Sequence, residues 1–359
     1  MALIAADTTF LIDPVNANLR IVSACDLSYF PGLCLTLSSA LVHLPEAMFP
    51  QITVIHEGLS RWHERKLTRL LKTHCSDAEI DFYPISLSKT KLPDAPGLHP
   101  LAYARLLAPG IVDEARFIYL DSDLLVLRDV SPLIELLDGR CLAVAPVCGI
   151  LGDDCPWLDP SKMRPDDPYF CSGIMAVDKA RWQANQITEQ SIALADKEPE
   201  KCKHYDQTVL NFVLHGMVKC VDESWSWNHW RFDNMPDGPV ILHYITGGKP
   251  WLAPLGYGAR GLWLRSFEKL CGDFLPGECL KTKTAAKANG YARSLQAWAG
   301  GAVDGSAAGR LLGGKAEEWR WAARKAREER SEATARVMTR ALERLDRQVK
   351  AVIPNPVSA

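Results

Sequence analysis

The first third of the chain alternates short apolar, β-branched runs with segments whose apolar residues recur at helical spacing. The runs LRIVSACD, QITVIHEGL and EIDFYPI predict strands. Between them, YFPGLCLTLSSALVHL and RWHERKLTRLLKTH repeat apolar residues every three or four positions, which predicts helices. Strands and helices in this order build a mostly parallel sheet with helices on its faces. The expected fold class is therefore α/β.

Further along the chain the same patterns continue less regularly. HPLAYARLLAPGIV predicts a helix that ends before Pro109, YFCSGIMAVDKARW a strand that turns into a helix, HYDQTVLNFVLHG a helix, and PVILHYITGG a last strand. The segment 149–168 is rich in Pro, Asp and Gly without periodicity, so it is either a plain surface loop or a lid. After Pro276 the composition shifts to Ala, Arg and Glu. We therefore expect a catalytic domain over 19–275 and a helical C-terminal extension over 276–359.

Bulk properties exclude several classes of protein. A net charge of -2 gives no reason to expect a nucleic-acid partner. The eleven cysteines form no C-x-x-C pair or zinc spacing, which favours free thiols in a reducing, cytoplasmic compartment. The first residues lack a basic start followed by an unbroken apolar run, and no stretch approaches 18 apolar residues, so no membrane span is expected.

Two aspartates, Asp121 and Asp123, directly follow the apolar run FIYL. An ordinary polar loop is one interpretation. The other is a metal site, because two carboxylates one residue apart at a strand end can turn toward one point, and hard divalent cations prefer oxygen ligands. His243 ends a later strand and is followed by Gly247, Gly248 and Lys249. A glycine-rich backbone with a nearby lysine suits a phosphate, so the set predicts a cation that bridges the protein to a diphosphate.

Five ordered motifs resemble the glycosyltransferases of family 8. They are IVSACDLSYFPGLCLTLSSAL, FIYLDSDLLVLRDVSPL, FCSGIMAVDKARW, YDQTVLN and HYITGGKPW, and they span roughly Leu19 to Phe274. The resemblance implies a GT-A fold, a UDP-sugar donor, Mn²⁺ (with Mg²⁺ as the alternative ion) and transfer with retention at the anomeric carbon.

The resemblance also implies roles for individual residues. Asp121, Asp123 and His243 would bind the metal. Arg105, Asp206 and Gln207 would lie at the reacting sugar, although Arg105 on sequence alone reads equally well as a surface arginine. The nucleotide would contact Asp26 and Tyr29 at the uracil and, along the rest of the donor, Arg105, Ser122, Gly247, Gly248 and Lys249.

Three local features depart from the family pattern or extend it. Cys171 stands where the family usually has Asn, and Thr246 stands where a glycine normally comes first. Trp225, Trp227 and Trp230 suggest a carbohydrate platform, with core packing the better interpretation for at least one of them and Trp230 the best candidate for an acceptor contact.

The predicted function is a Mn²⁺-dependent retaining transfer of glucose or galactose from a UDP-sugar to a glycan or lipid-linked saccharide acceptor. The alternative is a sugar-nucleotide-binding scaffold that acts through its C-terminal helix. A nicotinamide dehydrogenase is excluded because no G-x-G-x-x-G follows the first strand.

The C-terminal extension carries an amphipathic, basic pattern. Between Arg310 and Lys350 there are twelve Lys or Arg against seven Asp or Glu, and apolar residues recur at helical spacing: Val337, Met338, Ala341, Leu342, Leu345, Val349 and Val352. Such a helix either lies on the inner face of an anionic membrane, as a peripheral contact, or packs on the catalytic domain or a second copy. Both interpretations fit the sequence.

Overall fold

The computed structural model describes residues 18–86, 100–139, 141–235, 241–245, 249–251 and 258–272, with 336, 339–343 and 345–347 near the end of the chain. In these ranges, no helix has both the length and the apolar character needed to cross a membrane. The boundary predicted at residues 275 and 276 lies outside them.

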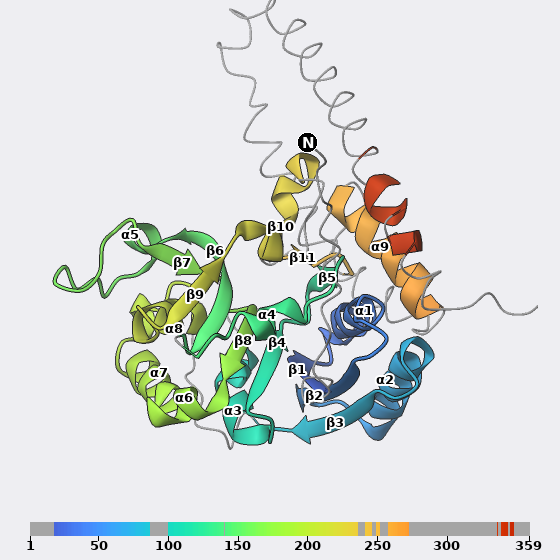
Figure 1. Cartoon of the computed structure of the whole chain (residues 1–359), viewed down its shortest axis with the longest axis horizontal. Coiled ribbons are helices and arrows are strands. Elements are labelled where there is room, and N and C mark those ends of the chain that lie inside the picture. The colour runs from blue at the N-terminus through green and yellow to red at the C-terminus, as the bar shows by residue number, and fades with distance from the viewer. Residues whose placement is uncertain are drawn as a thin grey trace, which may run out of the picture.

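A mixed sheet forms the centre of the molecule (Figure 1), in the order β3-β2-β1-β4-β8-β6-β7 with β9 beside β6. Its strands are β1 (Asn18–Asp26), β2 (Phe49–Glu57), β3 (Glu79–Pro84), β4 (Arg116–Leu120), β6 (Ala143–Ile150), β7 (Pro168–Phe170), β8 (Ile174–Asp178) and β9 (Val218–Val221). The strands from β3 to β4 pair in parallel, which confirms the predicted α/β sheet. Strand β8 runs antiparallel to both β4 and β6, which the sequence pattern did not indicate.

Successive residues of the central strands alternate between two hydrophobic cores. In β1, Leu19 and Ile21 face one core while Val22 and Ala24 face the other. The first core packs α1 (Phe30–Leu41), α2 (Arg61–His74), α4 (Pro132–Glu135) and α9 (Gly258–Cys271). The second packs η2 (Pro100–Leu107), α3 (Ala108–Ile111), α6 (Lys179–Ala184), α7 (Ile187–Lys197) and α8 (Asp206–Val213). In Figure 1, α1, α2 and α9 lie on one side of the central strands, and α6, α7 and α8 lie on the other.

A second, three-stranded sheet of β10 (Trp227–Asn228), β11 (Ile241–His243) and β5 (Leu124–Val126) lies over α1. Hydroxyl groups of α1 hold it in place: Thr36 Oγ1 accepts from the Leu124 amide at 3.0 Å, and Ser39 Oγ accepts from the Val126 amide at 3.0 Å. Strand β11 pairs antiparallel with β5 so that His243 stands opposite Leu124. The register therefore brings His243 beside the residue that follows Asp123.

The segment around Pro109 differs from the prediction. Instead of one helix that ends before Pro109, a 3₁₀ helix, η2, leads into the short α3, which contains both Pro109 and Gly110. Proline is tolerated there because the first turn of a helix leaves its amide groups unbonded. The predicted loop over 149–168 is confirmed only in part, because it contains the end of β6, the short helix α5 (Leu151–Asp154) and the start of β7. Further short 3₁₀ helices are η3 (Pro199–Lys201), η4 (Glu223–Ser226) and η5 (His229–Asn234).

The described residues near the end of the chain are helical and pack on α9. Ala341 and Leu345 are almost fully buried and belong to the first core, and Asp346 forms an ion pair with Lys269 of α9. Of the two interpretations of this segment, packing on the catalytic domain therefore holds for the described residues. Those apolar side chains cannot also insert into a membrane.

Candidate functional site

The turn between β4 and β5 carries the two aspartates. Two backbone hydrogen bonds fix its path: the Asp121 amide donates to Gly173 O at 2.8 Å, and the Tyr244 amide donates to Asp123 O at 3.0 Å. Each bond joins the turn to a segment far away in the sequence. The turn is thus built by tertiary pairing, and it is not a free polar loop.

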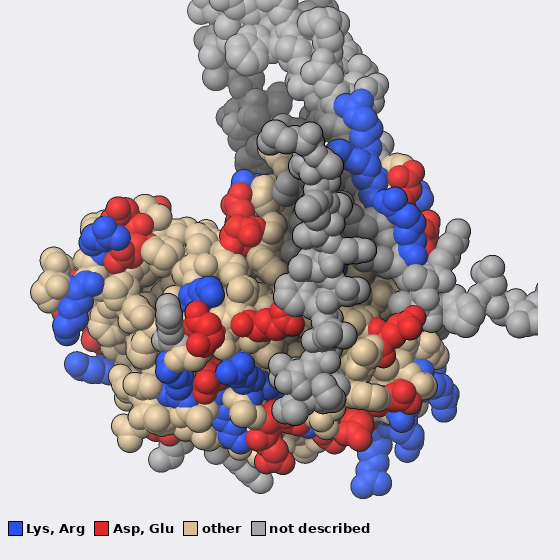
Figure 2. Space-filling view, viewed as in Figure 1, with Lys and Arg blue, Asp and Glu red and all other residues tan. Residues whose placement is uncertain are grey.

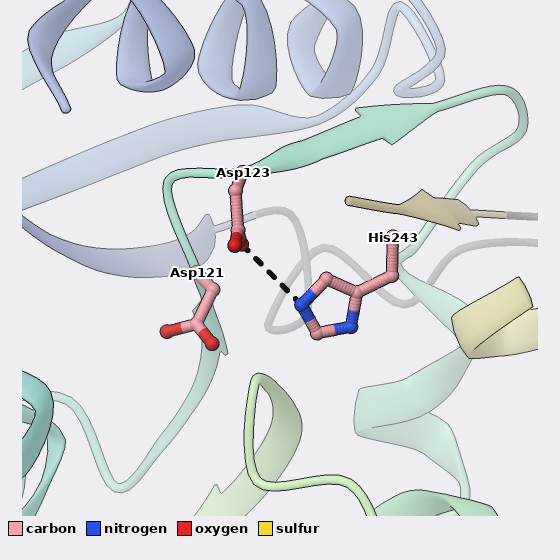
Figure 3. A group of neighbouring side chains, drawn as sticks. All are labelled: Asp121, Asp123 and His243. Atoms are coloured by element: carbon pink, nitrogen blue, oxygen red, sulfur yellow. Dashed lines mark ion pairs between the residues drawn. The ribbon is translucent and has the colours of Figure 1, made fainter. Parts of the chain in front are cut away.

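Asp121, Asp123 and His243 converge on one point (Figure 3), with one potential ligand atom from each lying within 4.8 Å of the others. Asp123 Oδ1 lies 3.3 Å from His243 Nε2 but makes no hydrogen bond to any described residue. Apart from this ion pair, the buried carboxylate oxygen has no hydrogen-bond donor among the described residues, which carries a desolvation cost. Two carboxylates and an imidazole are a donor set that suits a divalent cation such as Mn²⁺, so the residues present fit the predicted metal.

The space beside these side chains exists because residue 173 is glycine. A Cβ at Gly173 would lie 2.5 Å from Asp121 Oδ2 and 2.9 Å from His243 Cε1. Any other residue would therefore press on two of the three candidate ligands. The glycine of the FCSG motif keeps this volume open.

Where Asp121, Asp123 and His243 converge, the electrostatics favour a positive charge. Burial opposes ionisation of Asp123, but Lys249 and His243 lower the pKa of its carboxyl well below the usual range. Burial likewise opposes protonation of His243, yet Cys171 and Asp123 raise its pKa to about 10. Without a metal, a proton and the Lys249 ammonium supply the positive charge that the carboxylates attract, and a bound cation would take over that role.

The far side of the His243 ring has two partners that the sequence did not reveal. Ser226 Oγ lies 3.0 Å and Cys171 Sγ 3.6 Å from Nδ1. These contacts leave Nε2 turned toward Asp123. Cys171, noted above as a departure from the pattern that the motifs resemble, thus touches the histidine. No local pattern marks Ser226, because only the pairing of β10 with β11 brings it to His243.

Lys249 lies inside the site. Its Nζ donates to Asp123 Oδ2 at 2.5 Å and to Tyr244 O at 2.8 Å, and it sits 5.6 Å from the centre of the Tyr29 ring. The lysine therefore connects Asp123, a predicted metal ligand, with Tyr29, the predicted uracil contact. Gly247 and Gly248, the other predicted phosphate contacts, lie outside the described residues.

Arg105 is buried at the centre of a charged network, so its interpretation as a surface arginine is wrong. The guanidinium lies 2.9 Å from Asp121 Oδ1 and 3.0 Å from Asp206 Oδ2, and it donates to Ser172 Oγ at 2.8 Å. It also stacks over the Tyr119 ring at 4.9 Å. Arg105 thus links a predicted metal ligand to a predicted sugar-site carboxylate.

Helix α8 brings Asp206 and Gln207 to the same place. Ser172 Oγ donates to Asp206 Oδ2 at 2.9 Å, and the Ser172 amide donates to Gln207 Oε1 at 3.1 Å. One turn later, the Asn211 side chain bonds both the amide and the carbonyl of Phe170, as a neighbouring strand would. The YDQTVLN motif therefore supports the FCSG segment, which lines the candidate metal site.

The loop from β1 to α1 holds the predicted uracil contacts. Asp26 Oδ1 accepts from the amides of Ser28 and Tyr29 at 2.7 and 2.9 Å, so Asp26 shapes the loop. Trp251 supports it from behind: its Nε1 donates to Ser28 O at 2.9 Å, and its ring meets that of Tyr29 edge-on at 5.6 Å. Sequence reasoning missed Trp251, although it closes the HYITGGKPW motif.

The remaining predicted contacts are Ser122 and the three tryptophans, which differ in how deeply they are buried. Ser122 is buried, and its carbonyl oxygen lies against α1, where a Cβ on Gly32 would meet it at 2.1 Å. Trp227 is a core residue under the Arg231 guanidinium, as expected for at least one tryptophan, and Trp225 is partly buried. The side chain of Trp230 lies outside the described part of the structure.

Asp206 predicts a pH dependence of stability. Burial, with Asp121 adding to it against the opposing charge of Arg105, raises the pKa of Asp206 from 3.8 to about 6. Between these values the folded chain holds a proton that the unfolded chain has lost, so this contribution is present below about pH 4 and is lost as the pH rises through about 6. We expect Asp206→Asn to gain about 2–3 kcal/mol relative to the parent between these limits. Urea unfolding of both proteins across this range measures the difference, and a constant difference would contradict the assignment.

Comparison with known proteins places this geometry in a family. Residues 20–254 match the family model described as Glycosyl transferase family 8. The lipopolysaccharide 1,2-glucosyltransferase of Escherichia coli (strain K12) is 23% identical over 268 residues, which are 67% of this chain and 76% of that protein. The glycosyltransferase GlyE of Streptococcus pneumoniae serotype 4 (strain ATCC BAA-334 / TIGR4) is 28% identical over 170 residues, and the match covers 44% of this chain but only 38% of GlyE.

The fold also matches solved structures. The galactosyltransferase LgtC, in complex with donor and acceptor sugar analogs, superimposes with a TM-score of 0.60 at 19% identity, over 70% of this chain and 96% of that one. At this identity the match establishes the fold, which agrees with the GT-A architecture predicted from the motifs. Since the family model covers well over half of the chain, the chain belongs to glycosyl transferase family 8.

Proposed function

We propose that this family 8 protein is a retaining hexosyltransferase that moves glucose or galactose from a UDP-sugar to a saccharide acceptor, with Mn²⁺ bound. The observation that carries the proposal is the convergence of Asp121, Asp123 and His243, with Lys249 Nζ 2.5 Å from Asp123 Oδ2. Carboxylates, imidazole and ammonium gathered at the carboxyl end of β4 suit a cation together with a diphosphate. A site for a free, uncharged sugar would not require carboxylates, an imidazole and an ammonium group together.

Asp121, Asp123 and His243 would hold the ion. When bound, it would supply positive charge that neutralises the diphosphate of the leaving UDP. Lys249 would add a second positive charge at the same diphosphate, and its two hydrogen bonds fix the ammonium in place before the donor arrives. Tyr29 would offer its ring to the uracil, on the loop that Asp26 shapes.

The sugar would lie near Arg105, Asp206 and Gln207. Asp206 is 3% exposed and its Oδ2 is engaged by both Arg105 and Ser172. A carboxylate held in this way orients its neighbours, so we assign Asp206 to positioning Arg105 rather than to attack on the anomeric carbon. Gln207 is partly exposed and is the nearer candidate for contact with the sugar. Attack by the acceptor on the face that UDP leaves is then the favoured route to retention.

The names of relatives support the hexose. One relative is a glucosyltransferase of lipopolysaccharide, and one solved structure is a galactosyltransferase. Both transfer a hexose, so a lipid-linked or glycan acceptor and a UDP-hexose donor are the natural extension to this chain. With relatives at 19–23% identity on both sides, the proposal includes both glucose and galactose as the transferred sugar.

The test is a panel of UDP-sugars, with Mn²⁺ or Mg²⁺, scored for release of UDP. Slow donor hydrolysis reports the donor even when the acceptor is unknown. We expect hydrolysis of UDP-glucose or UDP-galactose that needs the divalent ion. Tight binding of a UDP-sugar without hydrolysis or transfer would favour the alternative of a scaffold protein.

Replacing Lys249 with Ala is predicted to lower turnover more than donor binding. Its charge acts most strongly as negative charge grows on the leaving diphosphate, so we expect kcat for donor hydrolysis to fall by about 10²–10³-fold and KM to change much less. Lys219→Ala, which removes a half-exposed lysine paired with Asp138, is the matched control. A rise in KM with unchanged kcat would make Lys249 a binding residue only.

A further inference from the structure

Helix α2 presents a row of positive charge on its outer face. Its 14 residues contain five Lys or Arg and one Glu, in a chain whose net charge is -2. At about 100° per residue, Arg61, Arg65, Lys66, Arg69 and Lys72 all fall within an arc of about 140°. The opposite arc holds Leu67, Leu70, Leu71 and His74, which are buried in the first core. The cations are therefore confined to one side of the helix.

The row is exposed to solvent. Arg61, Arg65, Arg69 and Lys72 are all exposed, and none forms an ion pair with another described residue. The single acid of the helix, Glu64, turns away toward His56, with Oε1 3.7 Å from Nε2. In Figure 2 several Lys and Arg side chains stand out at the lower right edge, where Figure 1 places α2. Four exposed cations on one face of a helix produce a positive field, which favours an anionic partner.

Two large apolar side chains accompany the row at the end of α2 that lies nearest the candidate site. Trp62 is 39% exposed within the cationic arc, with Lys66 Nζ 5.4 Å from its ring centre. Leu27, in the loop between β1 and α1, is 52% exposed. Both follow neighbouring strand ends, because Asp26 at the end of β1 pairs with Glu57 at the end of β2. Tryptophan beside lysine and arginine is the composition typical of a helix at a membrane interface.

From these observations we infer that α2 docks the protein on a membrane surface rich in anionic lipid. The four exposed cations of α2 match the negative headgroups, and Trp62 and Leu27 enter the headgroup region. The exposed apolar side chains of Trp62 and Leu27 favour a lipid surface as the partner, because a nucleic acid has no apolar layer for them to enter. Loop residues Asp26 and Tyr29 flank Leu27, so docking would bring the candidate donor site to the membrane face. This assigns membrane contact to α2 instead of the C-terminal helix, whose Ala341 and Leu345 are buried.

The test is co-sedimentation of the full chain with phosphatidylglycerol–phosphatidylcholine vesicles and with phosphatidylcholine vesicles. The key variant is Arg65→Gln, Arg69→Gln, Lys72→Gln, which changes three exposed side chains outside the candidate site. The matched control is Arg116→Gln, Arg128→Gln, Lys197→Gln, which removes the same charge from exposed positions elsewhere. Thermal melting of each variant verifies that it is folded.

We expect the parent and the control to bind anionic vesicles at low salt and to leave them at high salt. The α2 variant should lose at least about tenfold in affinity with an unchanged melting temperature. Vesicle binding that survives in the α2 variant, or falls equally in the control, would overturn the inference. So would a parent protein that ignores anionic vesicles but is retained by RNA. None of these readouts depends on sugar transfer, so the result is independent of the proposed function.

Discussion

Asp121→Asn or Asp123→Asn is expected to abolish sugar transfer and to weaken UDP binding in the presence of Mn²⁺. Each change removes an anionic oxygen from the three-residue set whose ligand atoms lie within 4.8 Å of one another. Loss of a mere partner of a metal ligand typically costs about 10- to 100-fold, so loss of a ligand should cost at least about a hundredfold. Isothermal titration with UDP, with and without Mn²⁺, and donor hydrolysis measure the two effects.

The matched control is Asp113→Asn, which neutralises an exposed aspartate of the loop between α3 and β4. It should leave UDP binding and hydrolysis at the level of the parent protein. For Asp123→Asn, the melting temperature also matters, because Lys249 and His243 lose a buried partner. A folded Asp121→Asn protein with full activity would show that the carboxylate has no part in catalysis.

Gly32→Ala is expected to destabilise the fold and the nucleotide loop together. Alanine normally favours a helix over glycine, but here its Cβ would lie 2.1 Å from the backbone oxygen of Ser122 and 2.5 Å from the Trp251 ring. The backbone between the two aspartates cannot shift without moving the candidate metal ligands, and Trp251 cannot shift without losing its hydrogen bond to Ser28. We expect a loss of about 2–3 kcal/mol in the free energy of unfolding and weaker UDP binding.

The comparison is with Gly110→Ala in α3, where the new methyl group would meet no atom within 4 Å. That change should be neutral or slightly stabilising, since it only removes freedom from the unfolded chain. Urea unfolding and UDP titration of the two variants distinguish the steric effect of a Cβ at position 32 from the general effect of replacing a helical glycine with alanine. Equal stability of both would mean that α1 tolerates a wider spacing from the aspartate turn.

The sequence predicted the elements that depend on local pattern. The short apolar, β-branched run LRIVSACD predicted β1, which is buried on both faces. Helical spacing in RWHERKLTRLLKTH predicted α2, whose buried face recurs with the period of a helix. The direction of β8 escaped this reasoning. A strand buried on both faces reads the same whichever way it runs, so Ile174 to Asp178 carried no sign of antiparallel pairing.

In the candidate site, too, local motifs predicted some residues, while tertiary contacts brought in others. Asp121, Asp123 and His243 were predicted through their motifs, and the structure brings their side chains together. The partners that tie them to the fold were not predicted. Ser226, Cys171 and Trp251 reach the site through strand register and ring packing between segments that are far apart in the sequence. Contacts of this kind depend on tertiary geometry, and no local spacing encodes them.

Arg105 illustrates why electrostatics was the hardest part to predict. On sequence alone it was either a surface arginine or a donor contact. Its burial excludes the surface arginine, and the donor contact stays a prediction. An arginine that is 8% exposed needs compensating carboxylates, and Asp121 and Asp206 supply them. Which charges end up paired depends on η2 and α8 meeting the aspartate turn, a result of the whole topology.

The central claim is that Asp121, Asp123 and His243 form a divalent-cation site that holds UDP, and Mn²⁺ electron paramagnetic resonance tests it most directly. Bound Mn²⁺ loses the sharp signal of the free ion, so titration of the protein reports binding without any enzymatic assay. We predict one Mn²⁺ site per chain, strengthened by UDP and lost in Asp123→Asn but retained in Asp113→Asn. Equal Mn²⁺ binding by the parent and Asp123→Asn, with UDP present, would contradict the account.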